Sequence, residues 1–149
     1  MTSHTVFIFN LIATWYMVGL IWMVQIVHYN LFDRVGNEAF AHYESEHNRL
    51  ITPIVGIPML IEIATAAALI WMTPSYLPRS VAWIGLALVG VIWLSTVALQ
   101  IPAHQRLLEG FDLATYKRLV NSNWIRTAAW SARGCLMAYY LSAAIQRLK

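Results

Sequence analysis

The stretch Val6–Tyr29, VFIFNLIATWYMVGLIWMVQIVHY, decides the fold of this chain. It contains no Asp, Glu, Lys or Arg, and it is long enough to cross the hydrocarbon core of a bilayer, which takes about 20 helical residues. Water is absent from that core, so a crossing segment must satisfy its own backbone hydrogen bonds, as a helix does. The stretch therefore predicts a transmembrane helix.

Three further apolar runs have a similar length and are predicted to form spans at 53–72, 81–101 and 124–145. The chain is 59% hydrophobic and only 11% charged, whereas a soluble domain has about 25% charged residues. We therefore expect one all-α domain over residues 1–149, an integral membrane four-helix bundle that crosses the membrane at 6–29 and at the three later spans. An even number of spans puts both termini on the same side.

The two longer connections, 30–52 and 102–123, are predicted to contain short interfacial helices over one mouth of the bundle. In the second connection, Asp112 is a suitable N-cap for the helix that follows it. Thr52 and Pro53 form a typical start for the second span, with threonine as the cap and proline at the first helical position.

Composition also limits the classes of function. The lone cysteine, Cys135, excludes an internal disulfide framework and a Cys-x-x-Cys redox pair. The net charge of +3 comes from scattered basic residues rather than a basic run, so we expect no nucleic-acid partner. No Lys or Arg precedes the first apolar run, so we expect that run to stay as a helix of a multi-pass membrane protein.

Polar side chains from all four predicted spans gather at one end of the bundle. The first and third spans end there, and the second and fourth begin there. Charged and polar groups at membrane depth are costly and usually face the interior of a bundle, so this gathering predicts a functional site. The residues are Gln25, His28, Glu44, His47, His104, Asn123, Trp124 and Arg126.

Three of these residues, His28, His47 and His104, are predicted to bind one metal ion, with Glu44 as a fourth ligand. Neutral imidazole suits iron, copper and zinc, and a carboxylate ligand favours iron or zinc. Glu44 and His47 are three residues apart and so share a helix face, a spacing that di-iron carboxylate proteins use. In the predicted metal site, the side chains that would orient ligands or substrate are those of Gln25, Asn123, Trp124 and Arg126. The alternative is that no metal binds and each histidine only caps a helix end.

Glu62 and Arg133 are predicted to lie at the same depth, because each is nine residues in from the same end of its span. Opposite charges at one depth near the bilayer midplane are expected to pair. The pair is either a structural ion pair or the floor of a substrate cavity. Arg126 and Arg133 are seven residues apart and face the same way, with Trp130 between them, which suits an anionic or quinone-like headgroup.

Five short strings are VQIVHY at 24–29, YESEH at 43–47, MLIE at 59–62, QIPAH at 100–104 and NWIRT at 123–127. Together they resemble a set of small, uncharacterised bacterial four-helix membrane proteins over most of the chain, which implies a location in the bacterial inner membrane. More loosely, Pro102-x-His104 followed by Asn-Trp-x-Arg-Thr is similar to the anthrone-oxygenase-like membrane family. That second resemblance implies oxidation of a hydrophobic aromatic substrate in the membrane.

Three hypotheses about function follow from these residues. The first is a metal-dependent membrane oxidoreductase that acts on a lipophilic small molecule, with Fe, Cu or Zn as the metal. The second is a membrane protein that binds haem b through two of the histidines. The third is a small transporter, or a quinone- or lipid-binding subunit, that uses Glu62 and Arg133. As a transporter it would require a homo-oligomer, because four helices without an internal repeat enclose little space.

Overall fold

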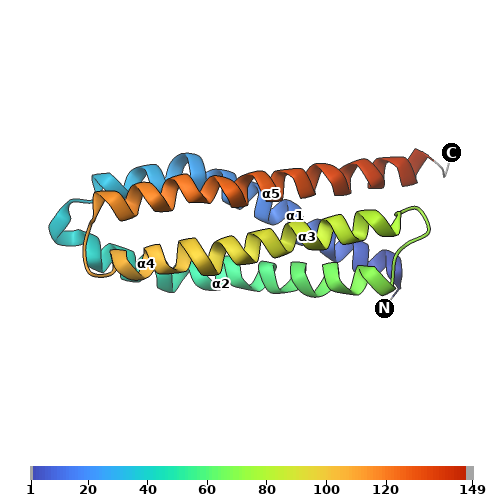
Figure 1. Ribbon diagram of the computed structural model, residues 1–149, viewed down its shortest axis with the longest axis horizontal. Coiled ribbons are helices and arrows are strands. Elements are labelled where there is room, and N and C mark those ends of the chain that lie inside the picture. The colour runs from blue at the N-terminus through green and yellow to red at the C-terminus, as the bar shows by residue number, and fades with distance from the viewer. Residues whose placement is uncertain (1, 147–149) are drawn as a thin grey trace.

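The structure, a computed structural model, describes residues 2–146 of the 149-residue chain, and these residues are almost entirely helical (Figure 1). No strand occurs within them, which confirms the predicted all-α class. The elements are α1 (Ser3–Met23), the π-helical turn η1 (Val24–His28), the 3-10 segment η2 (Tyr29–Arg34), α2 (Asn37–Trp71), α3 (Arg79–Ser95), the π-helical turn η3 (Thr96–Gln100), α4 (Ile101–Leu107) and α5 (Leu113–Gln146).

Four long helical segments run alongside one another. The α1 helix packs on α2 and α5, and α3 packs on the same two helices. Figure 1 shows that α1 begins and α5 ends at the same end of the molecule, on the right. The opposite end, on the left, carries η2 and the turn 108–112. We call it the histidine end, because His28, His47 and His104 lie toward it.

Within the described residues, three helical segments are long and apolar enough to cross a membrane: Ser3–Arg34, Asn37–Trp71 and Arg79–Leu107. Three of the four predicted spans therefore have the expected length and apolarity. The α5 helix is not in this group, because it also carries polar residues. Two of them, Arg126 and Arg133, are buried inside the molecule, so the composition of α5 understates how apolar its outer surface is. The fourth span remains a prediction.

The prediction of separate interfacial helices in the longer connections is wrong. Residues 37–52 are the first turns of α2, which continues without a break through Pro53 and Pro58 to Trp71. Residues 113–123 are likewise the first turns of α5. Proline removes only one backbone donor and is tolerated inside helices of this kind where neighbours hold the segment in place. The patterns at Gly36 and Asp112 marked real helix starts, but no stop follows them. The start predicted at Thr52 and Pro53 is wrong, because both residues lie inside α2.

The two real starts are explained by local chemistry. Gly36, with φ of 84°, turns the chain into α2 through a conformation that glycine adopts without strain. Asp112 caps α5 as predicted, since its Oδ2 accepts the backbone N–H of Thr115 at 2.7 Å. Hydrogen bonds from the side chain and the backbone of Thr115 lower the pKa of the Asp112 carboxyl, because they favour its charged form.

Candidate functional site at the histidine end

Two π-helical turns lie beside the site, one in each of the helices that approach the histidine end. A π-helical turn is rare, and such turns are frequent at functional sites. The η1 turn contains Gln25 and His28, and η3 ends at Gln100. Both glutamines are buried, with 2% and 1% of their surface exposed. The irregular turns thus bring polar side chains inward at the point where four segments meet.

The three predicted histidines come together around one aromatic ring. Phe32, in η2, is fully buried and lies edge-on to His28, His47 and His104 at centroid distances of 5.2, 5.2 and 6.4 Å. The His28 and His47 rings are 4.7 Å apart, and the His47 and His104 rings are stacked at 5.3 Å. The predicted gathering of imidazoles from separate helical segments is therefore present, with Phe32 as its packing centre.

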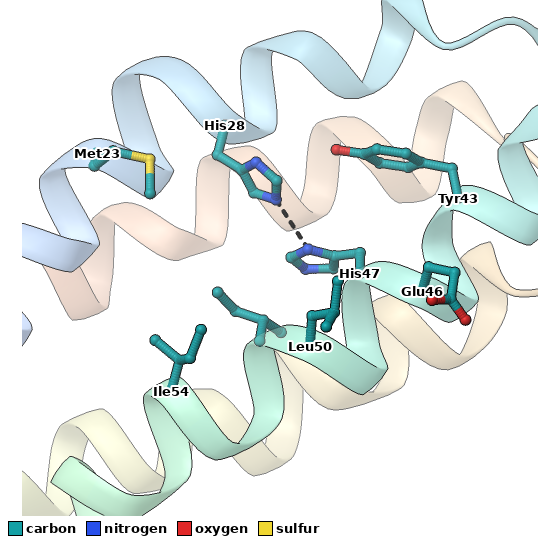
Figure 2. Close-up of a pocket in the computed structure, with 8 residues that line it drawn as sticks. Met23, His28, Tyr43, Glu46, His47, Leu50 and Ile54 are labelled. Carbon is teal, nitrogen blue, oxygen red and sulfur yellow. Dashed lines mark hydrogen bonds between the residues drawn. The ribbon is translucent and has the colours of Figure 1, made fainter.

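His28 and His47 form a hydrogen-bonded pair between η1 and α2. The Nε2 atom of His28 lies 2.9 Å from Nδ1 of His47, and Figure 2 shows the two rings facing each other across the gap between their helices. One of these nitrogens must carry the proton and the other must accept it. His47 is 9% exposed, and its Nε2 makes no hydrogen bond within residues 2–146, so this nitrogen remains available.

A second set of hydrogen bonds runs from α2 through α4 and η2 to α5. The Nδ1 atom of His104 lies 2.5 Å from Glu44 Oε1, and its Nε2 lies 3.1 Å from the Tyr29 hydroxyl. The Arg126 guanidinium donates to that same hydroxyl at 3.4 Å. One arrangement of protons satisfies every contact: arginine donates to tyrosine, tyrosine to His104 Nε2, and His104 Nδ1–H to the carboxylate. This series of hydrogen bonds can pass a proton between Tyr29 and Glu44 through the His104 ring.

Glu44 is fully buried, and only one of its two carboxylate oxygens accepts hydrogen bonds. Its Oε1 accepts from His104 and also from Asn48 Nδ2 at 3.1 Å. Its Oε2 is buried and has no hydrogen-bond partner. A buried carboxylate oxygen without a donor is costly, so this atom marks a place where a proton, a water molecule or a cation would stabilise the site.

Two predicted orienting residues hold Arg126 in place. The side-chain carbonyl of Asn123 accepts hydrogen bonds from Arg126 Nε at 2.8 Å and from Nη2 at 2.5 Å. The Asn123 amide in turn donates to Gln25 Oε1 at 2.8 Å, and Gln25 donates to the carbonyl of Val120 at 3.2 Å. Gln25 therefore connects η1 to α5 and fixes the direction of the guanidinium.

A cavity of about 470 Å³ lies beside these groups, between α1, α2, α5 and the η3–α4 segment, and is partly open to the outside of the molecule. We call it the internal cavity. Its polar end is formed by Tyr29, His47, Asn48, Gln100, His104 and Arg126. Its remaining wall is mostly apolar or aromatic and includes Met17, Leu20, Ile21, Val24, Val55, Met59, Trp93 and Trp130. Cavities of this size, apolar with a few convergent polar groups, are typical small-molecule sites.

A smaller recess of about 260 Å³ lies on the other side of the histidine pair. Figure 2 shows Met23 and His28 on one wall and Tyr43, His47, Leu50 and Ile54 on the other. His47 and Ile51 line both the recess and the internal cavity. The His28–His47 pair therefore stands between the two spaces.

Glu62 and Arg133 do pair, at 2.9 Å between Arg133 Nε and Glu62 Oε1. Both are buried, with 1% and 0% exposed, and neither lines the internal cavity or the recess. The carboxylate also accepts from Thr14 and Trp130. The guanidinium also donates to Asn10, Thr14 and the carbonyl of Gly85. Such a satisfied pair acts as a structural support, and only Trp130 connects it to the cavity wall.

The structure does not bring Trp124 to the site. Its side chain is 45% exposed and lies edge-on to Trp22 on the outer surface, at 5.7 Å between ring centroids. Sequence reasoning missed Tyr29 and Phe32, which connect and pack the three histidines. Tyr29 follows His28 directly, which points to a place in the site. Aromatic residues at the end of a span are also typical of the membrane interface, so the sequence alone does not separate the two roles.

The side chains are paired rather than arranged around a common point. Within residues 2–146, no three His, Cys, Asp or Glu side chains are positioned to hold one metal ion. Both nitrogens of His104 are already engaged, by Glu44 and by Tyr29. Comparison of the chain with protein-family models, with curated proteins and with solved structures gave no match.

Proposed function

We propose that this chain is an integral membrane protein in which four helices surround a site for a lipophilic small molecule, and that the site exchanges protons with this molecule during oxidation or reduction. The observation that carries the proposal is the internal cavity. It is apolar along most of its wall, and at one end it meets two hydrogen-bonded sets of titratable side chains.

The location of the cavity favours a ligand that comes from the bilayer. The outer surface of the helices is strongly apolar, as shown by exposed fractions of 78% for Trp71, 72% for Leu94 and 67% for Tyr139. The three helical segments apolar enough to span a membrane contribute most of the cavity wall. A molecule that fits this wall is itself apolar and partitions into the membrane.

Proton exchange is supported by the free nitrogen of His47. Oxidation of a quinol to a quinone releases two electrons to an acceptor and two protons to bases. His47 lines the cavity, and its Nε2 can take a proton from a bound hydroxyl, while Nδ1 passes its proton to His28 Nε2, 2.9 Å away. Positioned histidines are the commonest groups for such transfers. The Tyr29–His104–Glu44 chain offers a second route from the same cavity.

Dependence on Fe, Cu or Zn is part of the same proposal and rests on a different observation. The donor types suit these metals, and the unpartnered Glu44 Oε2 would gain a partner. No three such side chains within residues 2–146 lie around one point, and both nitrogens of His104 are engaged. Metal binding would therefore require His28, His47 and Glu44 to move toward one another, with His104 as the group that orients Glu44. A bound metal would supply a site for electron transfer to and from the lipophilic molecule.

Metal content is therefore expected to depend on the histidine pair. Protein purified without chelators should contain close to one equivalent of Fe, Cu or Zn by elemental analysis, and His28→Ala should lose most of it. His42→Ala, on an exposed turn of the same α2 helix, is the matched control and should retain the metal. Less than a tenth of an equivalent in the wild-type protein would reject the metal dependence and leave the proton-exchange proposal standing.

Haem binding, transport and the location of the protein in the cell are further proposals. Haem b would give a Soret absorption band in the purified protein. A transport role for Glu62 and Arg133 is disfavoured by their burial away from the cavity, although a homo-oligomer would add further surfaces. A position of both termini on one side of the membrane is supported by the way α1 begins and α5 ends at one end of the molecule. The bacterial inner membrane is proposed from the resemblance alone.

The cavity itself can be tested by filling it. Gly56 lines the cavity, and a Cβ atom added there meets no atom within 4 Å. Gly56→Phe is therefore expected to fold normally and to weaken binding of a short-chain benzoquinone at least tenfold, because its ring takes up ligand space. Binding is measured by quenching of the intrinsic fluorescence that the seven tryptophans provide.

Gly90→Phe is the matched control, since Gly90 is equally open to a Cβ atom but does not line the cavity. It should bind the quinone as the wild-type protein does. Equal binding by wild type, Gly56→Phe and Gly90→Phe would show that the quinone binds elsewhere, and the proposal would then lose its central observation.

A further inference from the structure

Arg126 is a buried cation in the cavity wall without a carboxylate partner. It is 6% exposed, and none of the ion pairs formed within residues 2–146 includes it. The two carboxylates buried in this part of the chain contact other side chains, Glu44 the His104 ring and Glu62 the Arg133 guanidinium. A charge buried without a counter-ion is expensive, most of all at membrane depth.

The hydrogen bonds of Arg126 do not replace a counter-ion. The Asn123 carbonyl accepts the two short ones, and it is neutral. The contacts to the hydroxyls of Tyr29 and Thr96 are both long, at 3.4 Å. The Nη1 atom makes only the Thr96 contact, so the guanidinium retains donor capacity as well as its charge.

A second donor in the same wall is unsatisfied. The indole Nε1–H of Trp93 is buried and has no hydrogen-bond partner, and the Trp93 side chain lines the cavity together with Arg126. Buried donors are almost always paired in folded proteins. One cavity is therefore lined by a cation with no direct counter-ion and by a tryptophan whose indole N–H has no partner, while its remaining surface is mostly apolar.

We infer that the cavity binds a lipophilic molecule through an anionic oxygen, a carboxylate or an ionised acidic hydroxyl, which neutralises Arg126 and accepts from Trp93. This inference rests on the proposed function and specifies its ligand class. The apolar body of the ligand would lie along Met17, Ile21 and Met59. Ion pairing with a pre-oriented guanidinium gives strong, directional hydrogen bonds, and Gln25 and Asn123 supply the pre-orientation.

The experiment compares each anion with its neutral twin in purified protein at pH 8. One pair is lauric acid and methyl laurate, measured by calorimetry. The other is an alkylated 2-hydroxy-1,4-naphthoquinone and its methyl ether, measured by tryptophan quenching. At least one anion is expected to bind about ten- to a hundredfold more tightly than its twin, as expected for hydrogen bonds to charged groups. The pair with the larger ratio of affinities shows whether the anionic oxygen of the ligand is a carboxylate or an ionised acidic hydroxyl.

Variants then assign the preference to its residues. Arg126→Gln should bring the ratio close to one, and Arg126→Lys should keep part of the preference. Trp93→Phe should weaken anion binding about three- to tenfold, the value of one neutral donor. Arg106→Gln is the control, because Arg106 is exposed and lies outside the cavity wall, and it should change nothing.

Three outcomes would overturn the inference. Neutral twins that bind wild type as tightly as the anions would reject the ligand class and leave the proposed cavity function intact. An unchanged ratio in Arg126→Gln would show that the preference arises elsewhere. Should that variant not fold, an unchanged ratio in Trp93→Phe decides against the inference in its place. No binding of any of the four compounds would instead reject the proposed function itself.

Discussion

Arg133→Met is expected to lower the free energy of unfolding by about 3–5 kcal/mol, the usual cost of removing one partner from a buried ion pair. The substitution leaves the Glu62 carboxylate buried without its cation. It also leaves Asn10 and the carbonyl of Gly85 without the donor that Arg133 provides. Thermal and denaturant unfolding in detergent, followed by tryptophan fluorescence and circular dichroism, measures the change.

Arg49→Met is the matched control for this prediction. Arg49 also pairs with a glutamate, with 2.7 Å between Nη2 and Oε2 of Glu46, but both side chains are largely exposed. Exposed ion pairs contribute little, because water solvates each partner when the other is removed. We therefore expect no measurable loss of stability. Equal effects of the two substitutions would contradict a structural role for the buried pair.

His47→Phe is expected to reduce turnover of a lipophilic quinol by about 10²- to 10⁴-fold, the range that a positioned proton-transfer group contributes. Phenylalanine keeps a ring beside Phe32 but removes both nitrogens, so the relay to His28 is lost. The assay follows oxidation of a short-chain benzoquinol in proteoliposomes. Ferricyanide accepts the two electrons one at a time, and the two protons are released to the buffer.

His42→Phe is the control, since His42 lies on an exposed turn of the same helix and should leave turnover unchanged. Quinone binding by His47→Phe should stay within about threefold of the wild-type value, which separates a role in proton transfer from a role in binding. If His47→Phe turns over as fast as the wild type, the proton acceptor is another group, and the Tyr29–His104–Glu44 chain becomes the first alternative.

Part of the site was predictable because helix geometry turns sequence spacing into position. His28 and His104 end apolar runs, and His47 precedes one, so the direction of each helix was enough to bring them to one end. The same reasoning placed Glu62 beside Arg133, since equal counts from one end of two helices give equal depth. Asp112 was predictable as a cap because that role depends only on the next few residues.

The partners of these side chains were not predictable. Glu44 and His47 share a helix face, yet Glu44 bonds to His104 and His47 bonds to His28. This choice depends on the rotation of each helix, and the π-helical turns η1 and η3 change that rotation. Trp124 has the right position along α5 but faces outward beside Trp22, which sequence spacing alone does not reveal.

The amino-acid sequence by itself determined the all-helical class, the long apolar segments and the end of the molecule where polar groups gather, because these follow from composition, helix rise and chain direction. Only the tertiary structure decided that His28 pairs with His47 and His104 with Glu44 around Phe32, and that Arg126 has no carboxylate partner within residues 2–146. Those features depend on contacts between segments far apart in the chain, whose relative rotation is set by packing.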